Sequence, residues 1–265
     1  KDAVHAVRGH LSETYRLHRR ILRNRRARVH GLTPPRGGAR VVEFPDPTAG
    51  QISRALENWR QETFELVASD PSLQALYGDW LRLLLESPTS LASSVRRRLM
   101  LLGPRQDAST ESRALARLLQ HLDSWDPVEA RLQALMKVID VRGAPMAKFV
   151  IFCTDAEVAD RCFTLLRARN ASAVARHESG LDVDNDRAPA WTRFLKSDDC
   201  RILVCDSTAE EGLNLQGGRK VLVHLDMPFA PNRIEQRLGR VDRFGSGDPV
   251  VSIILKCSDS DAEQA

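Results

Sequence analysis

The sequence contains no apolar run that approaches the about 18 residues of a membrane-spanning helix, so we expect no membrane segment. Its five cysteines form no C-x-x-C pair, and its seven histidines show no metal-ligand spacing with them. The absence of a G-x-S-x-G motif argues against a serine nucleophile on an elbow turn. An odd number of scattered cysteines without a signal peptide is typical of a reducing compartment. We therefore expect a cytoplasmic protein with no metal site.

Two phosphate-related patterns are also absent. A P-loop requires G-x-x-x-x-G-K-[ST], and the dipeptide Gly-Lys occurs nowhere in the sequence. No strand ends in a D-E-x-H-type motif that would hold Mg²⁺. The chain starts at Lys1 and its first methionine is Met100, so we expect it to be a piece of a longer product.

Positive charge is concentrated at the start of the chain. The net charge is only +4, from 39 Lys and Arg against 35 Asp and Glu, yet residues 1–40 hold eleven Lys and Arg against Asp2 and Glu13. This asymmetry favours an anionic partner, with nucleic acid as the leading candidate. The alternative is one strongly basic helix face or a poorly ordered arm.

The first half of the chain has helical periodicity up to about residue 140. A turn-rich cluster, HGLTPPRGG, interrupts this periodicity, and the ARVVEF stretch after it favours one short strand. A capping residue then stands before a proline at four places, a pattern that predicts helix starts. These are Asp46-Pro47, Asp70-Pro71, Ser87-Pro88 and Asp126-Pro127. We divide the chain into a basic segment (1–45), a helical region (46–125) and a third region (126–265).

The third region alternates strands with helices. Short apolar runs predict buried strands, and Asp155 is placed to cap a helix through about Arg169. The runs are KFVIFCT, SAVAR, RILVCD, KVLVHLD and VVSIILK. This alternation implies an α/β fold with a mainly parallel sheet and helices on both faces.

Polar residues follow three of the predicted strands, where ligands meet a parallel sheet. Thr154 and Asp155 follow the first strand, Ser207 and Thr208 open the stretch STAEEGLNLQ, and Asp226 precedes MPFAPNRIEQRLGRVDRFG. Each piece alone is weak evidence, because Ser-Thr after a strand is usually a cap and a basic helix face is usually solvated. Together, in this order, they indicate a site.

The stretch QRLGRVDRFG (236–245) places Gly239 in a predicted helix, where glycine costs about 1 kcal/mol relative to alanine. Gln236, Arg240 and Arg243 are spaced i, i+4 and i+7, so a helix would present them on one face. That face would be solvated or would hold a polyphosphate.

STAEEGLNLQ (207–216) and PNRIEQRLGRVDRFG (231–245) resemble motifs V and VI of superfamily 2 helicase-like ATPases, and KFVIFCT (148–154) stands where motif IV belongs. The combination of E-G-L-N-L-Q with P-N-R-I-E-Q-R-x-G-R-x-x-R-F-G resembles the Swi/Snf branch, within it the bacterial RNA-polymerase-associated remodellers. ETYRLHRRILRNRRARVHGL is similar to the basic segment that joins the two lobes in that branch. The resemblance implies a second RecA-like lobe over 126–265, a basic inter-lobe helix and linker over 1–45, and a family-variable helical insertion over 46–125.

The resemblance also implies roles in the motif VI segment. Arg240 and Arg243 match the two arginines that bind the γ-phosphate in this family, where an always-charged guanidinium fork suits phosphate oxygens. Gln236 matches the glutamine at the nucleotide cleft, and Gly239 would allow the backbone to come close to a ligand. Arg237 has an alternative interpretation, a pair with Asp242 or Glu235 on a solvated face.

In the motif V segment, Glu211 and Gly212 match residues that couple the nucleotide cleft to the nucleic-acid track. Thr154, Ser207, Thr208 and Asn214 would contact the nucleic-acid backbone. Several polar residues also have structural interpretations. Asn214 and Gln216 would satisfy loop backbone, Asp226 would be a structural cap, and the pairs Asp198-Asp199 and Glu210-Glu211 would be solvated loop residues.

The resemblance implies an ATP hydrolase that uses ATP with Mg²⁺ and tracks along double-stranded DNA in the prokaryotic cytoplasm, at the nucleoid. Because no P-loop is present, most nucleotide and Mg²⁺ ligands would come from a first lobe upstream of Lys1, and this chain alone would be inactive. RNA polymerase or another protein is a further expected partner. An RNA helicase lobe and a non-enzymatic DNA-binding module are the alternatives that the sequence leaves open.

Overall fold

A computed structural model describes residues 36–103, 109–142, 147–177, 190–215, 220–242 and 250–264. The predicted basic segment lies outside the described residues up to residue 35, and so do Gln216 and Arg243.

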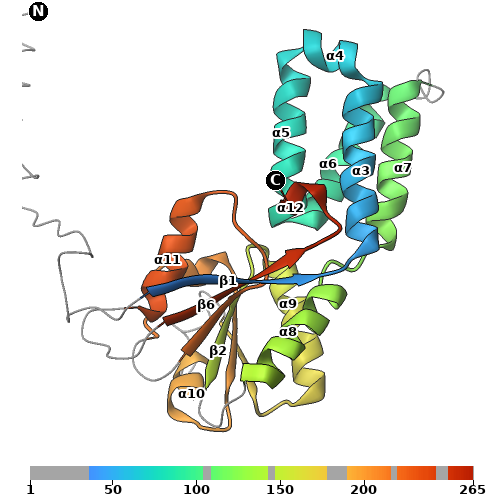
Figure 1. The fold of residues 1–265 in the computed structure, drawn as a ribbon. Coiled ribbons are helices and arrows are strands. Elements are labelled where there is room, and N and C mark those ends of the chain that lie inside the picture. The colour runs from blue at the N-terminus through green and yellow to red at the C-terminus, as the bar shows by residue number, and fades with distance from the viewer. Residues whose placement is uncertain are drawn as a thin grey trace, which may run out of the picture.

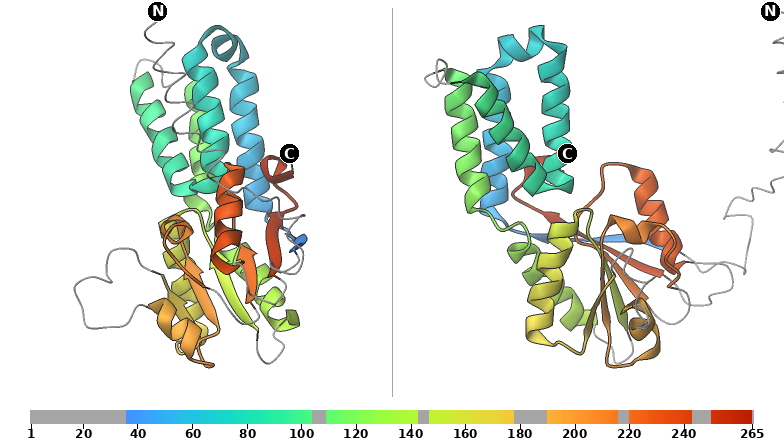
Figure 2. Two further views of the ribbon diagram at one scale, coloured as in Figure 1. Left: turned by 90° about the vertical axis from the view of Figure 1, so that its left-hand side faces the viewer. Right: turned by 180° about the vertical axis from the view of Figure 1, so that it is seen from behind.

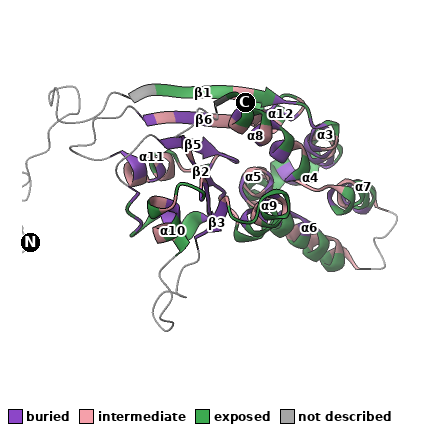
Figure 3. Ribbon diagram, turned by 90° about the horizontal axis from the view of Figure 1, so that it is seen from below, coloured by how far each residue is buried: buried purple, intermediate pink, exposed green. Residues whose placement is uncertain are grey.

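The described residues form a six-stranded sheet in the order β1-β6-β5-β2-β4-β3, and every neighbouring pair is parallel. The strands are β1 (Arg36–Phe44), β2 (Lys148–Phe152), β3 (Val174–Arg176), β4 (Ile202–Cys205), β5 (Lys220–His224) and β6 (Val250–Cys257). The expected α/β fold with a parallel sheet is therefore confirmed. Figure 3 shows the central strands buried and β1 largely exposed at the edge.

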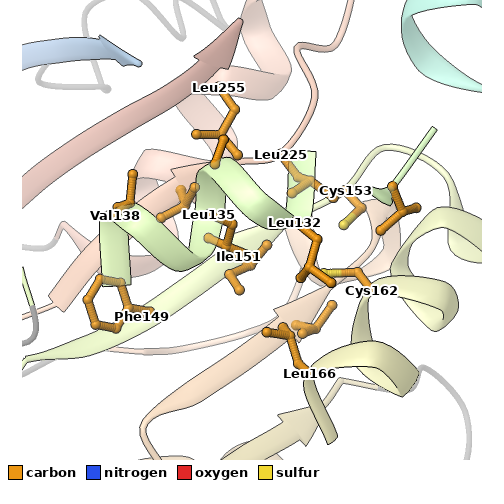
Figure 4. Packing of buried hydrophobic residues seen from close by; sticks show 14 of the residues in the cluster. Leu132, Leu135, Val138, Phe149, Ile151, Cys153, Cys162, Leu166, Leu225 and Leu255 are labelled. Carbon is orange, nitrogen blue, oxygen red and sulfur yellow. The ribbon is translucent and has the colours of Figure 1, made fainter. Parts of the chain in front are cut away.

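Helices cover both faces of this sheet (Figure 1). α8 (Glu129–Arg142) and α9 (Ala156–Arg169) lie on one face, and α10 (Ala190–Lys196) and α11 (Pro231–Val241) lie on the other. Side chains alternate along β2 accordingly: Phe149 and Ile151 pack with α8 and α9, as Figure 4 shows, whereas Val150 and Phe152 pack in the opposite core. Burial on both faces explains why the strands read as continuous apolar runs.

A second unit, the helical bundle, stands beyond the carboxyl end of β1 (Figures 1 and 2). It consists of α3 (Pro47–Glu62), α4 (Phe64–Ser69), α5 (Pro71–Glu86), α6 (Pro88–Leu102) and α7 (Thr110–Ser124). The bundle has its own core, in which the rings of Trp59 and Trp80 lie 4.7 Å apart at 53°. A separate core means that the bundle packs as a unit of its own.

Most of the predicted helix starts are observed. The Asp46 side chain accepts a hydrogen bond from Ala49 N at 3.0 Å, and Asp70 accepts one from Ser72 N at 2.8 Å. Asp155 caps α9 through Glu157 N and Val158 N. Ser87 differs, because it occupies the N-cap position of α6 without a side-chain capping bond and its hydroxyl donates to Asp155 instead.

Strand β1 belongs to the sheet, although the boundary drawn at residue 45 groups it with the basic segment. It runs parallel to β6 with Phe44 opposite Cys257, and the chain then leaves the sheet for the bundle. The start of α3 packs tightly on the segment after β6: a Cβ added to Gly50 would lie 2.6 Å from the Asp259 carbonyl oxygen. Asp46 N also donates to the Asp259 carboxylate at 2.7 Å. These contacts anchor the bundle at the edge of the lobe.

Candidate functional site

The site lies at the carboxyl ends of β4, β2 and β5, which are neighbours in the sheet. Thr154 follows β2 and Asp226 follows β5. The Asp226 carboxylate accepts hydrogen bonds from Thr154 N at 2.8 Å and from Thr154 Oγ1 at 2.6 Å. Asp226 therefore has a structural role, as the sequence favoured, but it joins two strand ends and does not cap a helix.

Asp206, at the end of β4, organises the next loop. It caps the short 3₁₀ helix η3 (Ser207–Glu210) by accepting from Thr208 N at 2.9 Å, and it also accepts from Arg176 Nη2 at 2.7 Å. Burial raises the pKa of Asp206, but the bonds from Thr208 and Arg176 outweigh burial and hold that pKa below its ordinary value. A charged Asp206 thus fixes the start of the motif V segment.

Arg237 lies at the centre of the site and is completely buried. Its Nε donates to Glu210 at 2.8 Å, its Nη2 to Thr154 Oγ1 at 2.9 Å, and its Nη1 to the Asp226 carbonyl at 3.1 Å. The solvated-face interpretation of Arg237 is therefore wrong. Burial raises the pKa of Asp226, and the charge of Arg237 and the bonds from Thr154 offset only part of that effect.

Glu210 is also buried, with 3% of its surface exposed, so its assignment to a solvated loop is wrong. Besides Arg237, it accepts two hydrogen bonds from Arg233, at 2.7 Å to Nε and 3.0 Å to Nη2. Arg233 and Arg237 are four residues apart, so they share one face of α11. One carboxylate from η3 thereby fixes the orientation of the helix that carries motif VI.

Arg240 is placed differently from these two arginines. It is half-buried, and its guanidinium makes two long bonds of 3.4 Å to the carbonyl oxygens of Gln236 and Leu213. Among the residues that the structure describes, no carboxylate pairs with it. Leu215 N donates to the Arg240 carbonyl at 3.0 Å, so the motif V segment lies directly against the end of the motif VI helix.

The predicted helical face through Gln236, Arg240 and Arg243 is described only as far as Arg240. α11 ends at Val241, and Asp242 follows in an extended conformation with φ −101° and ψ 100°. Gln236 and Arg240 remain on the helix together. The position of the Arg243 side chain lies outside the described residues.

The remaining predicted site residues lie at the surface of the same edge. Ser207, Thr208, Glu211, Gly212 and Asn214 are exposed, whereas Thr154 is half-buried. Gly212 has φ +78°, a conformation that favours glycine, so its residue type is explained by the turn.

Gly239 has no such backbone requirement. A Cβ at this position would meet no atom within 4 Å outside its own helix and neighbours, so packing within the described chain does not require a glycine.

The sequence analysis missed the contribution of Glu210, Arg233, Asp206 and Arg176. The i, i+4 spacing of Arg233 and Arg237 was the available signal for two of them, but spacing alone does not reveal a buried partner.

Within the described part of the chain, no group of three or more His, Cys, Asp and Glu side chains is arranged to hold a metal ion. None of the described helices has the length and apolar character to cross a membrane.

Comparison with known proteins agrees with this geometry. Residues 130–245 match the family model described as the helicase conserved C-terminal domain. The C-terminal part of the Fun30 ATPase domain superposes with a TM-score of 0.58 at 16% identity, covering 88% of each chain. The helicase domain of Hef from Pyrococcus furiosus gives 0.51 at 15% identity, covering 86% of this chain and 56% of the other. At these identities the two structures show the fold alone. Residues 130–245 are thus similar to helicase C-terminal domains.

Two curated relatives share sequence with this chain. RNA polymerase-associated protein RapA of Sodalis glossinidius (strain morsitans) is 34% identical over 125 residues, which are 46% of this chain and 12% of that protein. RapA of Cronobacter sakazakii (strain ATCC BAA-894) is 31% identical over 129 residues, which are 48% of this chain and 13% of that protein. The chain thus covers a small part of these relatives. Over the matched residues it is similar to a C-terminal helicase domain and to these relatives, in agreement with the resemblance that the motifs carry.

Proposed function

We propose that this chain supplies the second motor lobe of an ATP-dependent double-stranded DNA translocase. One observation carries the proposal: Arg240 is held half-buried on α11 beside the motif V segment without a described carboxylate partner, whereas Arg233 and Arg237 are both paired with carboxylates, Glu210 among them. A guanidinium held in place by a rigid helix, with donors to spare, is suited to an incoming phosphate.

In this proposal, ATP binds in a seam between this lobe and a first lobe. Phosphoryl transfer builds negative charge on the γ-phosphate oxygens, and Arg240 and Arg243 donate to these oxygens as arginine fingers. Gln236 and Gly239 lie at the nucleotide, and Glu211 and Gly212 connect it to the DNA track. Mg²⁺ neutralises charge on the phosphates, and we assign its ligands to the first lobe because this sequence has no motif for them.

The exposed groups at the sheet edge form the DNA track in this proposal. Ser207, Thr208 and Asn214 are accessible to backbone phosphates. Thr154 is assigned a supporting role there, since its hydroxyl already donates to Asp226 and accepts from Arg237. The curated relatives are named as RNA polymerase-associated, so RNA polymerase is a proposed partner of this protein. The proposed location is the bacterial cytoplasm, at the nucleoid.

The test is steady-state ATP hydrolysis by the intact protein that contains this chain, with duplex DNA or single-stranded RNA as the stimulating polymer. Arg240→Ala and Arg243→Ala are each expected to slow hydrolysis by roughly 10³-fold or more, while duplex DNA affinity stays unchanged. Arg97→Ala, at an exposed position on α6, is the control.

Near-normal turnover in both finger variants would remove the proposed role of the arginines. Stimulation by RNA alone would indicate an RNA helicase lobe. DNA binding without any hydrolysis by the intact protein would indicate a DNA-binding module.

A further inference from the structure

The last residue of α5, Glu86, extends from the helical bundle to the motif VI helix. The residue is 9% exposed, and its Oε1 accepts a hydrogen bond from Phe229 N at 2.7 Å. The same oxygen lies 3.6 Å from Arg233 Nη1. Glu86 therefore contacts both the segment that enters α11 and the first arginine of that helix.

In the part of the chain that the structure describes, the N-cap residue of α11 is Ala230, which makes no side-chain capping bond. The Phe229 side chain is 63% exposed, so burial of its ring contributes little to holding the backbone in place. A carboxylate beside the start of a helix is favoured by the positive end of the helix dipole, and a hydrogen bond to a charged acceptor is stronger than one between neutral groups. Glu86 thus provides a charged acceptor at the start of α11, where the helix has no side-chain cap.

The next residue of the bundle makes a parallel contact. The Ser87 hydroxyl donates to Asp155, the residue that caps α9 immediately after Thr154. The turn between α5 and α6 therefore contacts the loops after both β2 and β5, the strand ends that Thr154 and Asp226 join.

From Glu86 a continuous set of charged contacts leads into the site. Arg233 binds Glu210, Glu210 binds Arg237, and Arg237 binds Thr154 and the carbonyl of Asp226. Both of these arginines lie on α11, the helix that also carries Arg240. A displacement of Glu86 would act on the rigid helix as a whole.

We propose that Glu86 is a positioning residue through which the helical bundle sets the location of α11, and so of Arg240, during ATP hydrolysis. This inference rests on the proposed function. The bundle is then a control element for the hydrolysis step: a load or a partner that moves it changes the turnover number through this contact.

The experiment compares Glu86→Ala, Glu86→Gln and a matched control, Glu111→Ala, in the intact protein. Glu111 is also a buried carboxylate of the bundle, and it is paired at 2.9 Å with Arg98, which lies on the neighbouring bundle helix α6. DNA-stimulated kcat, KM for ATP and amide hydrogen exchange over residues 229–241 are measured for each variant.

Glu86→Ala is expected to lower kcat by roughly tenfold or more with KM nearly unchanged, because a shift of about 1 Å near the reacting groups can cost about a hundredfold. Exchange over 229–241 should become faster. Glu86→Gln should keep a kcat between those of Glu86→Ala and the wild type, because its amide oxygen still accepts a hydrogen bond from Phe229 N. Glu111→Ala should leave kcat and this exchange unchanged.

Equal behaviour of Glu86→Ala and Glu111→Ala, or faster exchange with unchanged kcat, would overturn the inference. If Glu86→Ala fails to fold, kcat and the exchange over 229–241 are compared between Glu86→Gln and the wild type. A lower kcat together with faster exchange supports the inference, and unchanged values overturn it. A wild-type protein that hydrolyses no ATP would defeat the proposed function first, and the exchange data would still show whether Glu86 holds α11.

Discussion

Arg237 and Glu210 form an ion pair of 2.8 Å in the interior of the lobe, with 0% and 4% of their side chains exposed. The pair joins the motif VI helix to the motif V segment and lies beside a second carboxylate, that of Asp226, at 3.5 Å. The two arginines of this motif therefore differ in role. Arg237 stabilises the lobe through buried ion pairs, whereas Arg240 has no described carboxylate partner and can bind a ligand.

This difference predicts unequal losses of stability for two alanine substitutions. Arg237→Ala should lower the free energy of unfolding by about 3–5 kcal/mol, because it removes the guanidinium beside the buried Asp226 and leaves the buried Glu210 with Arg233 alone. Arg240→Ala should cost less than about 1 kcal/mol, since surface-type contacts contribute little. Urea denaturation of both variants beside the wild type measures this, and a loss below about 1 kcal/mol for Arg237→Ala would contradict its structural role.

Substitutions of Thr154 and Ser207 are expected to affect different properties: the first lowers stability, and the second weakens DNA binding. Thr154→Val removes the hydroxyl between Asp226 and Arg237 and should destabilise the chain by about 1–3 kcal/mol. Ser207→Ala, at an exposed position, should change stability by no more than about 0.5 kcal/mol while weakening duplex DNA binding by the intact protein. Denaturation and fluorescence anisotropy with labelled DNA provide the two readouts. An unstable Ser207→Ala with normal DNA affinity would reverse the assignment.

Gly239 offers a test of ligand approach to α11. Gly239→Ala should stabilise the chain by about 0.5–1 kcal/mol, because helix propensity rises and nothing within the described chain occupies the space. If a nucleotide approaches this backbone, ATP hydrolysis by the intact protein should fall. Gly78→Ala, in α5 with equally open surroundings, is the control that should gain stability without losing activity. Full activity in Gly239→Ala would argue against close approach.

His224 should make the lobe sensitive to acid. Burial, helped by the charge of Arg237, lowers the pKa of His224 from 6.5 to about 3, and its Nε2 lies 3.1 Å from Ser252 Oγ. The unfolded imidazole takes up a proton as pH falls below 6.5, whereas the folded one does so only near 3, so stability falls with pH across this window. Between pH 7 and 5 the wild type should lose about 2 kcal/mol more than His224→Gln.

Denaturation curves at the two pH values measure the difference for His224. Parallel losses in the wild type and in His224→Gln would show that other groups carry the acid sensitivity.

Much of the fold could be predicted because its signals are local. The strands at 148–152, 202–205 and 220–224 are buried on both faces, so their sequences are continuous apolar runs. Asp46, Asp70 and Asp155 cap helices by bonding to backbone only two or three residues away. The place of β1 beside β6 has no local signal, since the two strands lie at opposite ends of the chain.

The candidate site was predictable only as a set of segments. The motifs brought residues 207–216 and 231–245 together, and their contact through Leu215 and Arg240 is observed. Glu210 was misjudged because a pair of glutamates in a polar stretch is usually solvated, whereas here two arginines of α11 compensate the cost of burial.

The order of residues by itself determined the strands, the helix starts and the resemblance to a helicase lobe, because each depends on spacing along the chain. Only the tertiary structure decided that Arg237 is enclosed, that Arg240 is available, and that Glu86 reaches α11. Helical spacing places Arg237 and Arg240 near one face of α11, but how deeply each is buried depends on η3, on the strand ends and on the bundle that fold against that face.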